Sequence, residues 1–106
     1  MTIIRTAGFR IRPESRHQVE GAVAMFSAAV RAGEPGTRLY LPLQDKGDPL
    51  RVTLLMVFDD DAAEAAHNRA DWSKAFGAGI VGHLAGGFSF LEYTEVSVYG
   101  EPEIDG

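Results

Sequence analysis

Strand-like and helix-like segments follow one another along this chain in an order that few folds accommodate. Residues 2–12 carry apolar side chains as on one face of a strand, and residues 15–33 carry them at helical spacing. Two more strand-like segments, 38–44 and 51–58, precede a second helical region and a last strand. The β-α-β-β-α-β order predicts an α+β, ferredoxin-like sandwich, in which a four-stranded antiparallel sheet carries both helices on one face.

Capping residues predict where the helices begin and break. Ser15, followed three residues later by Gln18, has the spacing of a capping box at the start of the first helix. The carboxylates at 59–61 favour the positive end of the second helix, and one of them is expected to cap it. The helical pattern breaks near Ala70, where Asp71 is a suitable N-cap for a further piece of helix.

The strand segments differ in the burial that their composition predicts. Pro42 has no N–H to donate, so segment 38–44 is expected at an edge of the sheet. Segment 51–58 is almost entirely apolar, which is typical of a central strand. The last strand is expected within residues 88–99, and an acidic tail follows at 100–106.

Composition restricts the classes of function. The 106 residues include no cysteine, which excludes disulfide scaffolds and thiolate metal sites. With 10 Lys and Arg against 15 Asp and Glu, the formal net charge is −5, so no nucleic-acid partner is expected. No apolar run approaches the roughly 20 residues of a membrane span, so no membrane partner is expected. The N-terminus does not resemble a signal peptide, which favours a cytoplasmic protein. One domain is expected over residues 1–99.

The sheet face opposite the helices needs a cover. When helices lie on one side only, apolar residues on the second face of the sheet must be shielded from water. A chain of this length also buries only roughly two thirds of its unfolded surface, so it gains from a partner. The sequence therefore predicts a homodimer that packs sheet against sheet.

The stretch PGTRLYLPLQDKGDPLRVTLLMVFDDDAAEAAHNRADWSKAF resembles the antibiotic biosynthesis monooxygenase family, and the resemblance in element order extends over residues 3–99. Tyr40 stands where the second strand of the family usually has an aromatic residue, and His67 stands on the helix that bears a histidine. Met56 departs from the pattern, because many members carry a glutamate there. The resemblance implies a dimeric α/β barrel that takes a small aromatic ligand.

The quinone-forming branch of this family is associated with an asparagine and a tryptophan four residues apart, and with oxygenation without flavin or metal. Asn68 and Trp72 have this spacing, and on a continuous helix they would lie about 40° apart on one face. The resemblance therefore implies Trp72, Asn68 and His67 as catalytic residues, with no cofactor and no metal. The alternative is that Trp72 is a core residue and Asn68 a solvated one.

A second set of residues is predicted to line the same cavity. Trp72 and His83 lie eleven residues apart and would share a helical face with Phe76. Phe76 and His83 are therefore predicted to contact the ligand, and the resemblance implies the same for Tyr40. The haem-degrading branch of the family resembles this arrangement through its helical histidine, although residues 7–8 do not supply its asparagine. A histidine near a helix end is alternatively a cap or a satisfied surface residue.

The strand arginines admit two interpretations. An arginine that faces the barrel interior would be a candidate clamp for an anionic substrate, whereas salt bridges to Glu92 or Glu95 are the simpler interpretation. The leading hypothesis is a cofactor-independent monooxygenase that oxidises a quinol-like or polycyclic aromatic. The alternatives are a non-catalytic ligand-binding or dimerisation module of the same fold and, less favoured, a haem-binding member.

Overall fold

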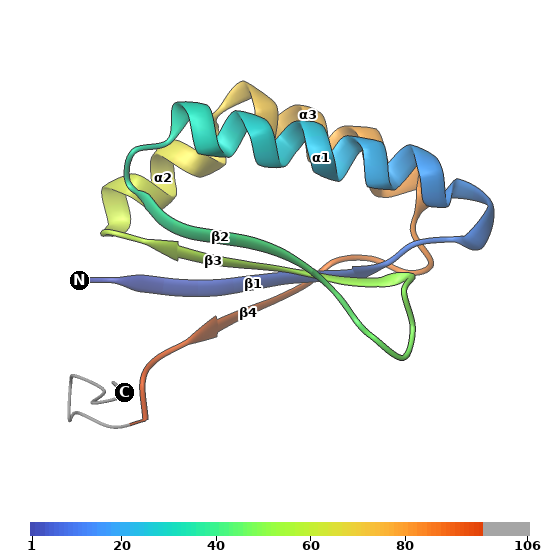
Figure 1. Ribbon diagram of the computed structural model, residues 1–106. Helices are drawn as coiled ribbons and strands as arrows, with labels where there is room; N and C mark the ends of the chain where they lie inside the picture. Colours follow the sequence, from blue (N-terminus) through green and yellow to red (C-terminus); the bar gives the residue numbers. More distant parts are fainter. Residues whose placement is uncertain (97–106) are drawn as a thin grey trace.

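The computed structural model describes residues 1–96 and confirms the predicted α+β, ferredoxin-like fold. Its strands pair antiparallel in the order β2-β3-β1-β4 and are β1 (Ile3–Arg10), β2 (Thr37–Gln44), β3 (Arg51–Phe58) and β4 (Ser89–Tyr93). The helices are α1 (Arg16–Gly33), α2 (Asp61–Arg69) and α3 (Asp71–Ile80), with 3₁₀ turns η1 (Pro13–Ser15) and η2 (Val81–His83). Figure 1 shows the helices gathered over one face of the sheet.

The strand positions follow the sequence pattern. Pro42 lies on the edge strand β2, as predicted, where it is the register partner of Leu54. Strand β3 is central, and alternate side chains along it are buried against the helices. The core lies between the sheet and the helices, and its largest fully buried side chains are Phe58, Ile11, Ile80, Leu84, Val19 and Val30.

The capping box predicted at the start of α1 is wrong. Ser15 occupies the N-cap position, but its side chain makes no capping hydrogen bond. Instead, the Gln18 amide donates to Nε2 of His83 at 3.2 Å, which leaves Nδ1 of the ring to donate to the Ser15 hydroxyl at 3.0 Å. These two side chains therefore bind η2 to α1. In contrast, the predicted cap of α2 is confirmed, because Asp60 accepts the N–H of Ala63 at 2.9 Å.

The predicted break near Ala70 is confirmed. Ala70 has extended dihedral angles, φ −62° and ψ 143°, which separate α2 from α3. The prediction that Asp71 is the N-cap is wrong, because Ala70 holds that position and Asp71 is the first residue of α3. Asn68 and Trp72 consequently belong to two helices rather than to one continuous helical face.

The last strand is shorter than predicted in its described part. Strand β4 ends at Tyr93, which is the register partner of Ile4 near the start of β1. Because β1 begins at Ile3, the backbone partners for a longer strand run out there. The predicted strand residues 97–99 and the predicted tail lie outside the described residues.

The sheet face away from the helices carries exposed apolar side chains. Leu91 and Tyr93 on β4 are 52% and 46% exposed, and on β2 the corresponding exposed side chains are Leu39, Leu41 and Leu43. No helix in the part of the chain that the structure describes is long and apolar enough to cross a membrane. The exposed leucines and Tyr93 make the open face an apolar surface of the kind that marks an interface.

Candidate functional site

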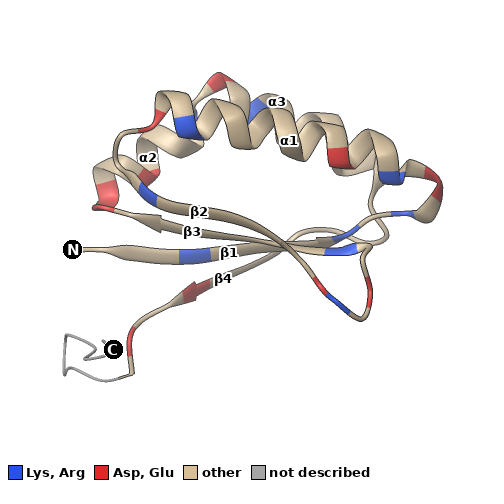
Figure 2. Cartoon of the chain, in the orientation of Figure 1, with Lys and Arg blue, Asp and Glu red and all other residues tan. Residues whose placement is uncertain are grey.

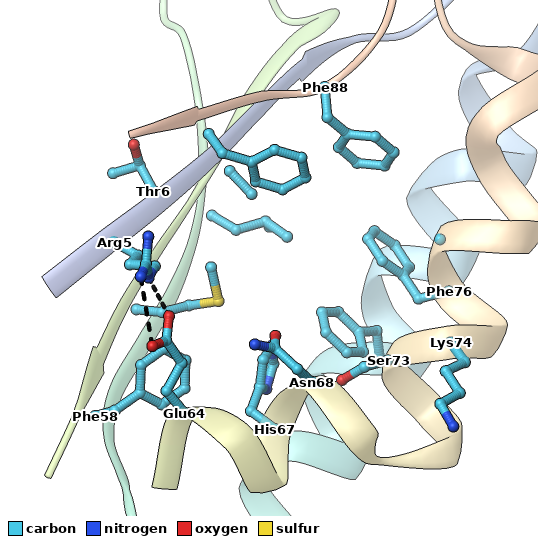
Figure 3. A pocket seen from close by; sticks show the side chains of 16 residues that line it. Arg5, Thr6, Phe58, Glu64, His67, Asn68, Ser73, Lys74, Phe76 and Phe88 are labelled. Atoms are coloured by element: carbon cyan, nitrogen blue, oxygen red, sulfur yellow. Dashed lines mark hydrogen bonds and ion pairs between the residues drawn. The ribbon is translucent and has the colours of Figure 1, made fainter. Parts of the chain in front are cut away.

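A cavity of about 260 Å³ lies between the helices and the sheet, near the junction of α2 and α3. Figure 3 shows side chains from β1, from β3, from both of these helices and from the segment just before β4, and Phe26 of α1 also lines the cavity. Its walls are mainly apolar, and its polar side chains come from β1, α2 and α3. The large apolar side chains in the wall are Phe26, Leu54, Met56, Phe58, Phe76, Phe88 and Phe90.

His67 is the buried polar residue of this cavity. Its ring lies between Phe26 and Phe58, with ring centroids 5.7 and 5.1 Å away, and its side chain is only 9% exposed. Nδ1 lies 2.8 and 3.0 Å from the two carboxylate oxygens of Glu34, whose side chain is 6% exposed. Since a carboxylate only accepts, Nδ1 carries the hydrogen of the neutral ring. Nε2 makes no hydrogen bond with any described residue, so its lone pair is free beside the cavity.

The Glu34 carboxylate collects two further donors. Nε1 of Trp72 donates to it at 2.5 Å, and the hydroxyl of Thr37 donates at 2.6 Å. Gly33 makes room for the indole, because a Cβ at this position would lie 2.7 Å from Cη2 of Trp72. Sequence reasoning missed Glu34. The sequence feature that could have pointed to Glu34 is that it is the single acidic residue between positions 21 and 44.

The structure brings together three of the six predicted site residues. His67, Asn68 and Phe76 line the cavity. Trp72 is not among the lining residues; it packs on Gly33 and reaches the site only through Glu34. The premise of one helical face shared by Asn68 and Trp72 is therefore wrong, because the chain turns at Ala70.

The remaining two predicted residues also lie off the cavity. Tyr40 is buried edge-on against Phe26, with centroids 5.8 Å apart, and its hydroxyl accepts from Ser27 at 3.1 Å. Burial raises the pKa of Tyr40 above its ordinary value. Ser15 of η1 and Gln18 of α1 hydrogen-bond His83 in η2. The predicted face shared with Trp72 is not formed, because α3 ends at Ile80, before His83.

Arg5 and Glu64 form an ion pair in the cavity wall that the sequence did not predict. Nε and Nη2 of Arg5 both donate to the Glu64 carboxylate, as the dashed lines in Figure 3 mark. Nη2 also lies 3.5 Å from Glu92, which confirms the predicted pairing of a strand arginine with the last strand. In Figure 2, a basic position on β1 lies beside an acidic position on β4. The hydrogen bond to Glu64 raises the pKa of Arg5.

Met56 lines the cavity, and β3, which has no acidic residue, contributes no carboxylate here. The carboxylate in the wall is instead that of Glu64, which comes from α2. The hydroxyl of Ser73 also lies in the wall and is the single buried side-chain N or O atom without a hydrogen-bond partner among the described residues. No group of three or more potential metal ligands occurs within residues 1–96.

Solved structures share this fold at low sequence identity. A candidate antibiotic biosynthesis monooxygenase from Caulobacter crescentus CB15 superposes with a TM-score of 0.83 at 24% identity, over 91% of each chain. Rv0793 from Mycobacterium tuberculosis superposes with a TM-score of 0.83 at 15% identity, over 92% of this chain and 97% of its own. At such identities the likeness shows the fold alone.

No curated protein sequence matches the chain significantly. The sequence profile of one family, however, matches residues 2–79, which span the sheet strands β1 to β3 and nearly all of the three helices. The chain therefore belongs to the antibiotic biosynthesis monooxygenase family.

Proposed function

We propose that this protein is a cofactor-independent monooxygenase that oxidises a quinol-like or polycyclic hydroxyarene in the cavity beside His67. The observation that carries the proposal is the imidazole itself: it lines an apolar cavity, Glu34 holds its Nδ1, and its Nε2 is free. A histidine with this arrangement is a suitable general base. The cavity lies just below the roughly 300–1,000 Å³ range of pockets for drug-sized ligands, which favours a compact aromatic.

The proposed chemistry uses both the aromatic and the polar side chains that line the cavity. The aromatic side chains, Phe26 and Phe76 among them, would hold a planar ring, while Nε2 of His67 takes its hydroxyl proton. The Asn68 amide, which has no hydrogen-bond partner among the described side chains, would donate to the resulting phenolate oxygen. An electron-rich phenolate in a dry site can transfer an electron to dioxygen itself, and the radical pair then forms a carbon–oxygen bond.

The reaction balances without an external reductant. Anthrone gives the same phenolate-type anion by losing a proton from its CH₂ carbon or, as its hydroxyarene tautomer, from its hydroxyl. One oxygen atom of O₂ then enters that carbon to give anthraquinone, and the other leaves as water with the two hydrogens of that carbon. The substrate supplies all four electrons. The protein's part is therefore to move one proton at Nε2, to orient the ring and to exclude bulk water.

Oxygen uptake with anthrone and a panel of quinols tests this proposal. We expect turnover by the wild type and a loss of about 10²- to 10⁴-fold in kcat for His67→Gln, as for removal of a general base. Asn68→Ala should lose about tenfold or more. His17→Gln is the matched control, because His17 is exposed in the first turn of α1. Absent turnover, or equal rates in His67→Gln and His17→Gln, would contradict the proposal and favour the non-catalytic ligand-binding alternative.

Trp72 has a different proposed role from the one that the family resemblance implies. Its indole donates to Glu34 rather than to the cavity, so we assign it as a residue that positions His67. Trp72→Phe keeps the ring on Gly33 but removes the N–H. We expect a loss in kcat smaller than that of Asn68→Ala, with KM nearly unchanged.

We also propose a homodimer in which the open sheet faces of two copies pack together. The support is the row of exposed apolar side chains on β2 and β4, where Leu91 is 52% exposed and Leu43 is 44% exposed. Exposed apolar surface of this kind, on a sheet with helices on the other side, is typical of an interface. The cavity lies on the helix side, so both copies would keep their cavities intact.

A further inference from the structure

We propose that Glu64 makes the cavity selective for uncharged ligands, because it occupies the Arg5 guanidinium that would otherwise bind an anion. The proposal rests on the proposed function only in taking the ligand to be aromatic. It names the class of substrate: an aromatic that is neutral when it enters, such as a phenol, and not an aromatic carboxylate.

Arg5 is placed to be an anion clamp. It lies on β1, its side chain points into the space between sheet and helices, and it lines the cavity together with Asn68 and His67 (Figure 3). Arginine is the side chain that best recognises carboxylates, because its planar fork donates two parallel hydrogen bonds. An unpaired guanidinium here would therefore attract anionic aromatics.

Glu64 already occupies the Nε/Nη2 edge of this fork. Nε and Nη2 of Arg5 donate to the two oxygens of Glu64, whose side chain is 16% exposed. Glu64 lies one helical turn before Asn68 on α2, so it is held on the cavity side of that helix. Glu92, the register partner of Arg5 on β4, lies 3.5 Å from the same guanidinium. One positive and two negative charges therefore meet at this end of the cavity.

An anionic ligand binds unfavourably at this position. Either it displaces the Glu64 carboxylate, which leaves that charge without its partner in the wall, or it lies close to the two negative carboxylates. Lys74 is the other cation of the lining, but it is exposed and forms no ion pair with a described residue. A solvated ammonium of this kind attracts anions only weakly. A neutral hydroxyl can instead bond to Asn68 and His67.

Titration with 2-naphthol and 2-naphthoate tests the proposal, because the two compounds share a ring system and differ in charge at neutral pH. Binding is followed by ¹⁵N–¹H NMR through the backbone amide of Gly77 and the side-chain amide of Asn68, which both line the cavity. We expect the wild type to bind 2-naphthol at least about tenfold more tightly than 2-naphthoate.

Substitutions identify the residues responsible. Glu64→Gln should tighten 2-naphthoate binding by about tenfold and leave 2-naphthol within about twofold, and adding Arg5→Gln should abolish the gain. Glu92→Gln should give a smaller gain in 2-naphthoate affinity. This variant replaces Glu64→Gln in the test if Glu64→Gln does not fold. Glu20→Gln is the matched control, because Glu20 pairs with Arg16 along α1, away from the cavity.

Three results would overturn the selectivity proposal alone: equal binding of the two compounds by the wild type, no gain in either single variant, or a gain that persists without Arg5. If neither compound shifts the Gly77 or Asn68 resonances in any variant, the cavity does not take aromatics. That result would overturn the proposed function together with the selectivity.

Discussion

Three donors from three different elements meet on the carboxylate of Glu34. They belong to Thr37 on β2, His67 on α2 and Trp72 on α3. Hydrogen bonds to an ionised group are stronger than neutral ones, and a buried carboxylate needs several of them. Glu34 therefore both joins these elements and sets which nitrogen of His67 faces the cavity.

Glu34→Gln tests this role. The amide keeps the size of the side chain but replaces one acceptor oxygen with a donor, so we expect the free energy of unfolding to fall by roughly 1–3 kcal/mol. ¹⁵N NMR of the imidazoles should show His67 as the Nδ1–H tautomer in the wild type and as a mixture in the variant. Glu14→Gln, at an exposed position of η1, is the control. A wild-type His67 protonated on Nε2 would contradict the assignment.

Tyr40 predicts a specific alkaline sensitivity. Burial raises the pKa of its hydroxyl above the ordinary 10.0, so the folded state holds this proton more tightly than the unfolded state. The resulting stability is fully present below about pH 10 and is lost as the pH rises through the higher folded pKa. Urea unfolding between pH 8 and 11 should show that Tyr40→Phe loses less stability over this range than the wild type.

At the scale of elements, α1 packs against α3 through a contact between the indole of Trp72 and the end of α1. The C-terminal residue of α1 is Gly33, and the ring lies directly on it. The sequence suggests only that glycine ends the helix, because it does not show what packs against the missing side chain. The contact is between residues far apart in the chain and so leaves no local pattern.

Two glycines of α1 should respond in opposite directions to alanine. Gly33→Ala would place a Cβ 2.7 Å from Trp72, so we expect a loss of about 1–3 kcal/mol in the free energy of unfolding. Gly21→Ala meets nothing within 4 Å and should gain about 0.5–1 kcal/mol through helix propensity. Urea unfolding measures both, and the fluorescence of the single tryptophan should shift only in Gly33→Ala. Equal effects in the two variants would contradict the described contact.

The elements that the sequence predicts well are those with local signals. The strand order, the edge position of Pro42 and the break at Ala70 all depend on periodicity or on a single residue's backbone chemistry. The site depends on contacts between distant residues: Glu34 bonds His67 and Trp72 at separations of 33 and 38 residues, and Arg5 meets Glu64 at a separation of 59. The capping box was mistaken for the same reason, since its two side chains turn to a distant ring rather than to their own helix.

At the scale of the whole molecule, the two faces of the sheet differ in what covers them. One face and the helices enclose the core and the cavity, and the other presents exposed leucines from β2. The proposed dimer would bury this second face. The fold alone assigns neither a partner nor a reaction, so each requires its own measurement.

Leu41→Arg tests the dimer. A guanidinium in the middle of an apolar interface would be buried without a partner, so we expect a monomer at concentrations where the wild type is a dimer. Met25→Arg is the control, because Met25 is also an exposed apolar residue but lies on α1. Size-exclusion chromatography with light scattering gives the masses. A monomeric wild type, or a dimeric Leu41→Arg, would contradict the proposed interface.

We propose that the protein inserts one atom of dioxygen into a hydroxyarene bound beside His67, and mass spectrometry of the product formed under ¹⁸O₂ tests this most directly. With anthrone as substrate, the wild type should give anthraquinone that carries one ¹⁸O atom, at a rate about 10² times or more that of His67→Gln. Anthraquinone formed no faster than in buffer, or formed equally fast by His67→Gln, would contradict the claim.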